Sequence, residues 1–194
     1  MLLSCKNHKT DKKDSSNKQN PITTKEYKSS SGKLFIISED HSLGYSIVKV
    51  TIETKKFTEH NSVYNLGELE PIEEVFFADL DHNGFEEIYF TTRSAGSGSY
   101  SYIYGFASNN DKSASPIYIP QITKNDLDSG AFFEGFAGHN KFKLESKQMM
   151  NCFPIYENGD NNSSPSGGNR CVNYSLIAGE AGWILQPIQS TKKD

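Results

Sequence analysis

Long apolar runs are missing from this 194-residue sequence. No stretch approaches the roughly 18–20 consecutive apolar residues of a membrane-spanning helix, so the sequence predicts no such helix. Basic side chains are in the minority, with 20 Lys and Arg against 24 Asp and Glu. This balance argues against general nucleic-acid binding, which needs basic patches. No segment of about 20–50 residues repeats, which counts against a propeller or a solenoid.

The first 30 residues differ in composition from the rest. They contain seven Lys, two Asp and one Glu, and almost no apolar side chain lies between Cys5 and Ile22. The segment carries a net charge of +4, which leaves −8 for residues 31–194. Such a polar segment cannot bury enough apolar surface to offset the entropy lost on ordering. We expect a disordered tether over residues 1–30 and a folded domain over residues 31–190, whose acidity would suit a cationic partner.

The first five residues, Met-Leu-Leu-Ser-Cys, resemble the end of a bacterial lipoprotein signal peptide, whose cysteine is acylated. The resemblance implies lipidation of Cys5 and a lipid anchor in the outer membrane, in the periplasm or at the cell surface. The charged start of such a signal is missing, so Met1 would be internal to a longer gene product. The alternative is an intracellular N-terminus with a chance cysteine. The polar tether favours anchoring, because an anchored domain needs a flexible spacer.

The cysteine count agrees with lipidation. Three cysteines are odd for a secreted protein, but removing Cys5 leaves Cys152 and Cys171 as a pair. A disulfide between them would close a loop of ~18 residues and typically stabilise the fold by ~2–4 kcal/mol. The alternative is two reduced thiols in the core. We expect the disulfide.

From residue 33 onward, short β-type segments alternate with turn residues. Residues 45–52 show the period of two of a half-buried strand, with Val48, Val50 and Ile52 on one face. Further strands are expected over residues 34–37, 74–78, 87–92, 100–107, 116–119, 141–144, 149–156, 172–177 and 182–188. The only expected helix covers residues 123–133. The pattern predicts a mainly β fold, a single antiparallel β-sandwich or barrel-like domain with at most one short helix.

An acidic segment between two expected strands has the spacing of a calcium loop. Oxygen-bearing side chains occur at alternate positions and a glycine permits a sharp turn. The candidate ligands are Asp79, Asp81, Asn83 and Glu87. The segment resembles the calcium loops of integrin-type propeller repeats, but it occurs once. The alternative is a hairpin turn in which Asn83-Gly84 supplies positive φ and the acids are solvated.

The next turn is rich in small residues and ends in an aromatic strand. It is not a nucleophile elbow, because Ala95 stands where Gly is needed two residues before Ser97. It is not a dinucleotide or phosphate loop, because a strand follows it. With no acid–base pair elsewhere, we expect no enzyme. The alternatives left open are a flexible hairpin tip and a recognition loop with Tyr as a rigid anchor. The recognition loop would consist of Arg93, Ser94, Gly96, Ser97, Gly98, Ser99, Tyr100 and Tyr102.

Several spaced motifs together resemble the bacterial periplasmic inhibitors of invertebrate-type (I-type) lysozyme. They are Ser-Gly-Ser-Tyr at 97–100, Asp-Leu-Asp-His-Asn-Gly at 79–84, Phe-Pro-Ile-Tyr at 153–156 and Pro-Ser-Gly-Gly-Asn-Arg at 165–170. The family implies an antiparallel β-sandwich, often dimeric, whose Ser-Gly-x-Tyr loop plugs the active-site cleft of the lysozyme. Inhibitors of chicken-type lysozyme have Ser-Gly-x-x-Tyr, a spacing that fails here because residue 101 is Ser.

The resemblance thus implies a lysozyme as partner, most specifically an I-type lysozyme, with a homodimer as an option and no required cofactor. Calcium remains an optional ligand of the acidic loop. Two other classes stay open. One is a calcium-stabilised cell-surface adhesion or carbohydrate-binding module. The other is a structural subunit that uses exposed edge strands within an envelope complex.

Overall fold

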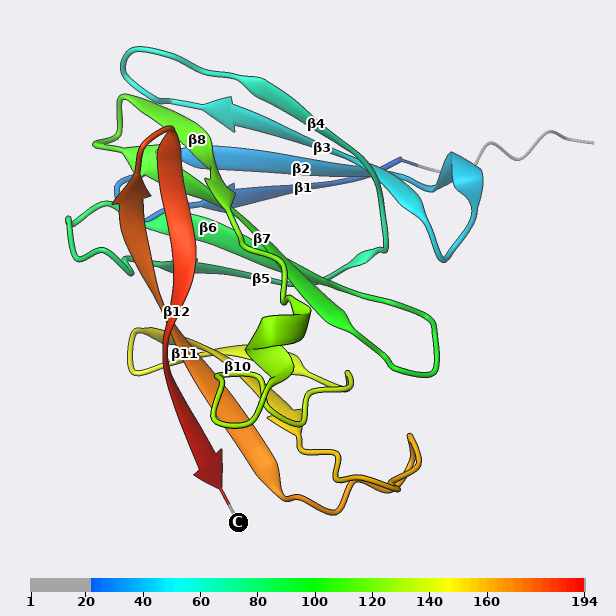
Figure 1. The fold of residues 1–194 in the computed structure, drawn as a ribbon. Helices are drawn as coiled ribbons and strands as arrows, with labels where there is room; N and C mark the ends of the chain where they lie inside the picture. Colours follow the sequence, from blue (N-terminus) through cyan, green and yellow to red (C-terminus); the bar gives the residue numbers. More distant parts are fainter. Residues whose placement is uncertain (1–21, 194) are drawn as a thin grey trace, which may run out of the picture.

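The computed structural model describes residues 22–193, which are almost entirely β (Figure 1). The strands are β1 (Ile22–Lys28), β2 (Leu34–Asp40), β3 (Val48–Lys55), β4 (Val63–Leu69), β5 (Ile72–Ala78), β6 (Glu87–Arg93), β7 (Ser101–Asn109), β8 (Ser113–Tyr118), β9 (Lys141–Glu145), β10 (Gln148–Pro154), β11 (Asn169–Gly179) and β12 (Gly182–Lys193). Two short 3-10 turns, η1 (His41–Leu43) and η2 (Lys124–Leu127), are the only helical elements in this part of the chain. The predicted mainly β fold is confirmed.

The strands form two sheets. One has the order β1-β2-β3-β4, and the other has the order β5-β6-β7-β8-β12-β11-β10-β9. All neighbours pair antiparallel except β8 and β12, which pair parallel where Ile117 and Tyr118 meet Trp183 and Ile184. In Figure 1, β11 and β12 run downward from beside β8, and β10 lies below β5–β8.

The first core lies between the four-stranded sheet and one face of β5–β8. In β3 the expected alternation holds, because Val48, Val50 and Ile52 are fully buried. They face a cluster that includes Phe90 of β6 and Phe106 of β7. Full burial of a side chain of this size contributes ~1.5–3 kcal/mol relative to exposure. This core joins the two sheets.

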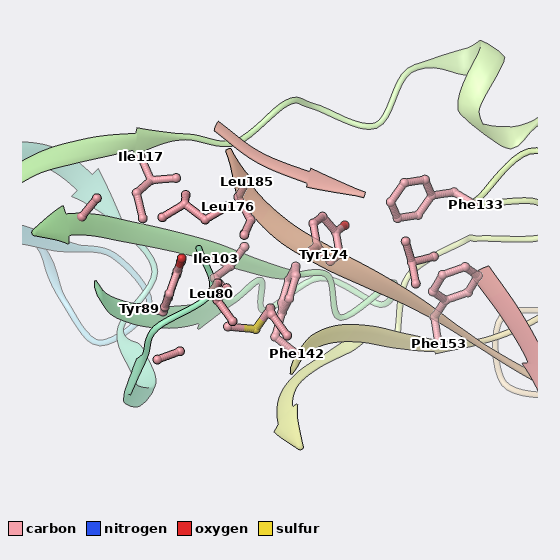
Figure 2. Close-up of a cluster of buried hydrophobic side chains, with 14 residues drawn as sticks. Leu80, Tyr89, Ile103, Ile117, Phe133, Phe142, Phe153, Tyr174, Leu176 and Leu185 are labelled. Atoms are coloured by element: carbon pink, nitrogen blue, oxygen red, sulfur yellow. The ribbon is translucent and has the colours of Figure 1, made fainter. Parts of the chain in front are cut away.

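The second core lies on the opposite face of β6 and β7, against β9–β12. In Figure 2 this cluster extends from Tyr89 of β6 to Phe153 of β10. Strand β6 therefore has a core on each face, and every residue from Glu87 to Thr92 is buried. A strand buried on both faces holds its two ends in fixed positions, and both candidate sites lie at those ends.

The predicted boundary of the tether is wrong. Strand β1 begins at Ile22, within the segment expected to be disordered, and it pairs with β2 along its whole length. The side chains of β1 are mostly exposed, which is compatible with its polar composition. Backbone pairing with β2 and β-forming residues such as Tyr27 stabilise the strand. At the other end β12 continues to Lys193, beyond the expected limit of 190. Cys5 and the rest of residues 1–21 lie outside the described residues.

One local prediction is also wrong, and one further strand was missed. Residues 123–133 do not form a helix, because η2 ends at Leu127 and the chain turns through Gly130, whose φ is 82°. No strand was predicted over residues 63–69, where the structure has β4. Gly67 lies within this strand, and the pairing of β4 with β3 shifts register opposite Val50 and Thr51, so its apolar and polar residues do not alternate regularly.

Candidate functional site

The β6–β7 loop, residues 94–100, connects two strands of the buried sheet and projects from one end of the sandwich (Figure 1). Its base closes when the Ser94 N–H donates to the Tyr100 carbonyl at 2.8 Å and the Tyr100 N–H donates to Ser94 Oγ at 2.9 Å. Its tip turns where the Ser99 N–H donates to the Gly96 carbonyl at 2.9 Å. The loop therefore has a defined internal conformation.

Arg93 braces the loop from below. Its Nη1 donates to the carbonyl oxygens of Ser99 at 2.9 Å and Asn140 at 3.2 Å. Its Nε donates to the Glu73 carboxylate at 2.9 Å. Arg93, which was predicted as a residue of the recognition loop, is thus the last residue of β6, and its guanidinium group is paired with groups of the protein itself.

A second brace comes from residues 138–140, about 40 positions along the chain. The His139 N–H donates to the Gly98 carbonyl at 2.7 Å. The buried Asn140 side chain pairs with the backbone of Ser101, accepting from its N–H and donating to its carbonyl, both at 2.9 Å. A Cβ on Gly138 would collide with the Gly98 carbonyl oxygen, so only glycine permits this close approach. Sequence reasoning missed these three residues.

A third contact comes from the β10–β11 loop, residues 155–168. Asn162 Nδ2 donates to the Ser97 carbonyl, and the Tyr156 hydroxyl donates to the Asn162 carbonyl at 3.0 Å. The Asp160 carboxylate accepts the N–H groups of Glu157 and Ser166, and these bonds lower its pKa. This loop is ordered by its own polar contacts.

The predicted disulfide is present at the base of the β10–β11 loop. Cys152 and Cys171 are directly paired across β10 and β11, and their sulfur atoms are bonded. The covalent link and the strand pairing together fix where the loop begins and ends. The loop that contacts Ser97 therefore starts from a rigid base.

The braces leave the outer side of the β6–β7 loop exposed. Ser97 and Tyr100 are both exposed, and the Tyr100 ring packs edge-on against Phe136 with ring centres 5.7 Å apart. A side chain on Gly98 would overlap the Tyr100 ring, so glycine allows the ring its position. Tyr102 is on β7, and its ring is also exposed. The loop thus leaves hydroxyls and a supported aromatic ring exposed at the surface.

The acidic candidate site lies at the opposite end of β6, in the β5–β6 turn. Carboxylate oxygens of Asp79, Asp81 and Glu87 lie within 4.8 Å of one another. The Asn83 amide donates to Asp81 Oδ2 at 2.7 Å, and the Asn83 and Gly84 N–H groups donate to Asp79. The structure brings together the three predicted acidic ligands. The turn's own donors occupy part of the hydrogen-bonding capacity of Asp79 and Asp81. The hairpin alternative is met only in part, because positive φ occurs at His82 and Gly84 and not at Asn83, and Glu87 is buried instead of solvated.

Glu87 is the most perturbed carboxyl group in this cluster. Its side chain is fully buried and its Oε2 accepts from the Leu80 N–H at 2.9 Å. Burial raises the pKa of Glu87 to about 8, with the charges of Asp81 and Asp79 adding to the effect. Burial also raises the pKa of Asp81. In the absence of a cation, Glu87 is therefore mostly neutral at pH 7.

Comparison with known proteins gives no relative: no family model, curated protein or solved structure matches this chain. Among the described residues, no helix is long and apolar enough to cross a membrane.

Proposed function

We propose that this protein is an inhibitor of lysozyme, most specifically of I-type lysozyme, that inserts residues 97–100 into the active-site cleft. The observation that supports the proposal is a loop held by three separate parts of the chain, with the hydroxyl-bearing Ser97 and Tyr100 left exposed. A loop already ordered in the free protein loses little conformational freedom on binding, which favours affinity.

The chemistry of the target suits this loop. Lysozymes hold two carboxyl groups in a cleft, one of them protonated to act as the acid. The hydroxyls of Ser97 and Tyr100 would donate hydrogen bonds to these groups, while the Tyr100 ring displaces water from the cleft. Because the inhibitor contributes no reacting group, it would act by occupying the cleft and would not be an enzyme.

Lipidation of Cys5 belongs to the same proposal. A lipid anchor followed by a polar spacer would hold the inhibitor at the bacterial envelope, where lysozyme attacks its substrate. Mass analysis of the native protein tests this point, and an unmodified Cys5 would refute the anchor.

The function is tested by turbidity assays of cell-wall lysis with lysozymes of the I-, chicken- and goose-types. We expect the strongest inhibition with the I-type enzyme. Inhibition of none of the three would refute the proposal and favour an adhesive or structural role.

Gly138→Ala tests whether the shape of the loop matters. The added methyl group would collide with the Gly98 carbonyl and displace the loop, so we expect inhibition to weaken about tenfold or more in the turbidity assay. The matched control is Gly130→Ala. Both glycines have positive φ, 104° and 82°, but a methyl group on Gly130 has open space around it. Equal inhibition by the two variants would show that bracing of the loop is unimportant.

A calcium-stabilised adhesion or carbohydrate-binding module is the second candidate, supported by the clustering of Asp79, Asp81 and Glu87. It predicts a Tm that rises when calcium replaces EDTA, because a bound ion stabilises the folded state by mass action. Asp81→Asn should reduce the rise. Calorimetry of both proteins with calcium and with EDTA is the measurement. A Tm that does not respond to calcium in the wild-type protein contradicts this candidate.

A further inference from the structure

The connection between β2 and β3 carries exposed apolar side chains that neither core uses. Tyr45 is 87% exposed and Leu43 is 48% exposed, and Ile47 is also exposed. Residues 45–47 were expected to begin a strand, but β3 begins only at Val48. Neighbouring Ile22, at the start of β1, is 64% exposed. We call Ile22, Leu43, Tyr45 and Ile47 the apolar tip.

These residues lie at one end of the four-stranded sheet. Ile22 pairs with Asp40, the last residue of β2, and η1 follows immediately and contacts both β1 and β3. The Asp40 carboxylate accepts the Ser42 N–H at 2.9 Å, which orders the turn that carries Leu43. The apolar side chains are therefore displayed on a structured turn. Exposure of several apolar groups together is a typical mark of a protein or membrane contact.

The position of the apolar tip favours a contact with a membrane over a contact with another protein. Residues 1–21, which we call the leader, immediately precede Ile22 in the sequence, and Ile22 belongs to the tip. The leader contains five Lys and two Asp, a net charge of +3. Basic segments next to apolar anchors are attracted to anionic lipid headgroups. Tyr is favoured at the boundary between headgroups and acyl chains, because its ring is apolar and its hydroxyl is polar.

We propose that the apolar tip docks on the surface of a membrane that contains anionic lipid. Leu43, Tyr45 and Ile47 enter the interface, and the net positive charge of the leader sequence favours anionic headgroups. Docking at the tip does not require acylation of Cys5, and it does not depend on lysozyme inhibition. Where Cys5 is acylated, the tip adds a second contact, and two contacts are what stable membrane attachment requires.

The test is vesicle co-sedimentation of the full 194-residue chain with Cys5→Ser, so that no acyl chain contributes. Vesicles contain phosphatidylglycerol in one arm and only phosphatidylcholine in the other. We expect binding to the anionic vesicles, and at least about tenfold weaker binding for Leu43→Ser/Tyr45→Ser, because both buried apolar surfaces are lost. The exposed positions of both side chains mean that the fold should tolerate these changes.

The matched control is Val63→Ser/Tyr118→Ser, which removes one aliphatic and one tyrosine side chain that are 67% and 64% exposed elsewhere. It should bind vesicles as the wild type does. Equal binding by both double variants would overturn the proposal, as would a lipid-free dimer that Leu43→Ser/Tyr45→Ser converts to monomer. Inhibition measured without lipid should be the same in all three proteins, so failure of the inhibitor function would leave the vesicle result standing.

Discussion

Tyr100→Ala is expected to weaken inhibition of I-type lysozyme at least about 30-fold. A hot-spot Tyr contributes ~2 kcal/mol or more to binding, and each 1.4 kcal/mol is a factor of ten in affinity. A hydrogen bond from Ser97 to a charged carboxylate would contribute a further ~1.5–3 kcal/mol, so Ser97→Ala/Tyr100→Ala should lose still more. Inhibition constants from the turbidity assay measure both effects.

Tyr118→Ala is the control for this prediction. Tyr118 ends β8 and is more exposed than Tyr100, so its removal tests whether loss of any surface tyrosine weakens inhibition. Circular dichroism and thermal unfolding should be unchanged in all variants, since none of these side chains is buried in either core. A Ser97→Ala/Tyr100→Ala protein that inhibits as well as the wild type would refute the proposed role of the loop.

Much of the fold could be predicted because local pattern and final burial agree. Val48, Val50 and Ile52 alternate with polar residues and are all buried on one face. The Cys152–Cys171 disulfide was expected from the cysteine count, and it joins directly paired residues of adjacent strands. The strand period is a local signal, and the cysteine pair follows from a count over the whole chain once Cys5 is set aside. Neither prediction requires knowing which distant segments pack together.

Elements stabilised by their neighbours could not be predicted in this way. Strand β1 buries little of its own surface, and its stability comes from hydrogen bonds to β2, which its composition does not encode. The contacts that hold the β6–β7 loop also have no local signal in the sequence. Gly138 and Asn140 are far along the chain from Gly98 and Ser101, and only the folded sheets bring them together. Local signals located the loop, but not what holds it.

In the acidic turn, the spacing of the residues predicted which side chains lie together but not their protonation states. The alternating pattern predicted that Asp79, Asp81 and Glu87 would lie together, and they do. The pattern treats all three as ionised ligands, whereas burial of Glu87 beneath the turn makes its charged form costly. The burial follows from the position of Glu87 at the start of a strand that has a core on each face, which a turn motif does not reveal.

Glu87→Gln is therefore expected to stabilise the protein, by an amount that grows as the pH rises from about 4.5 to about 8. The folded state keeps a proton on Glu87 up to a pKa of about 8, whereas the unfolded chain loses it near the ordinary value of 4.5. Between these values the unfolded state binds fewer protons, so the stability of the wild type falls as pH rises. Gln stays neutral at every pH, and its carbonyl oxygen can still accept the Leu80 N–H.

The predicted gain in unfolding free energy is close to zero near pH 4.5 and reaches on the order of 3–5 kcal/mol near pH 8, since each pKa unit corresponds to ~1.4 kcal/mol. Urea denaturation in EDTA across this pH range measures it. Glu145→Gln, at an exposed position that ends β9, is the control and should show no such trend. A gain that does not grow with pH would mean that Glu87 is ionised in the folded protein. Because EDTA removes divalent cations, the backbone N–H donors of Leu80, Asn83 and Gly84 would then have to hold the ionised carboxylates together.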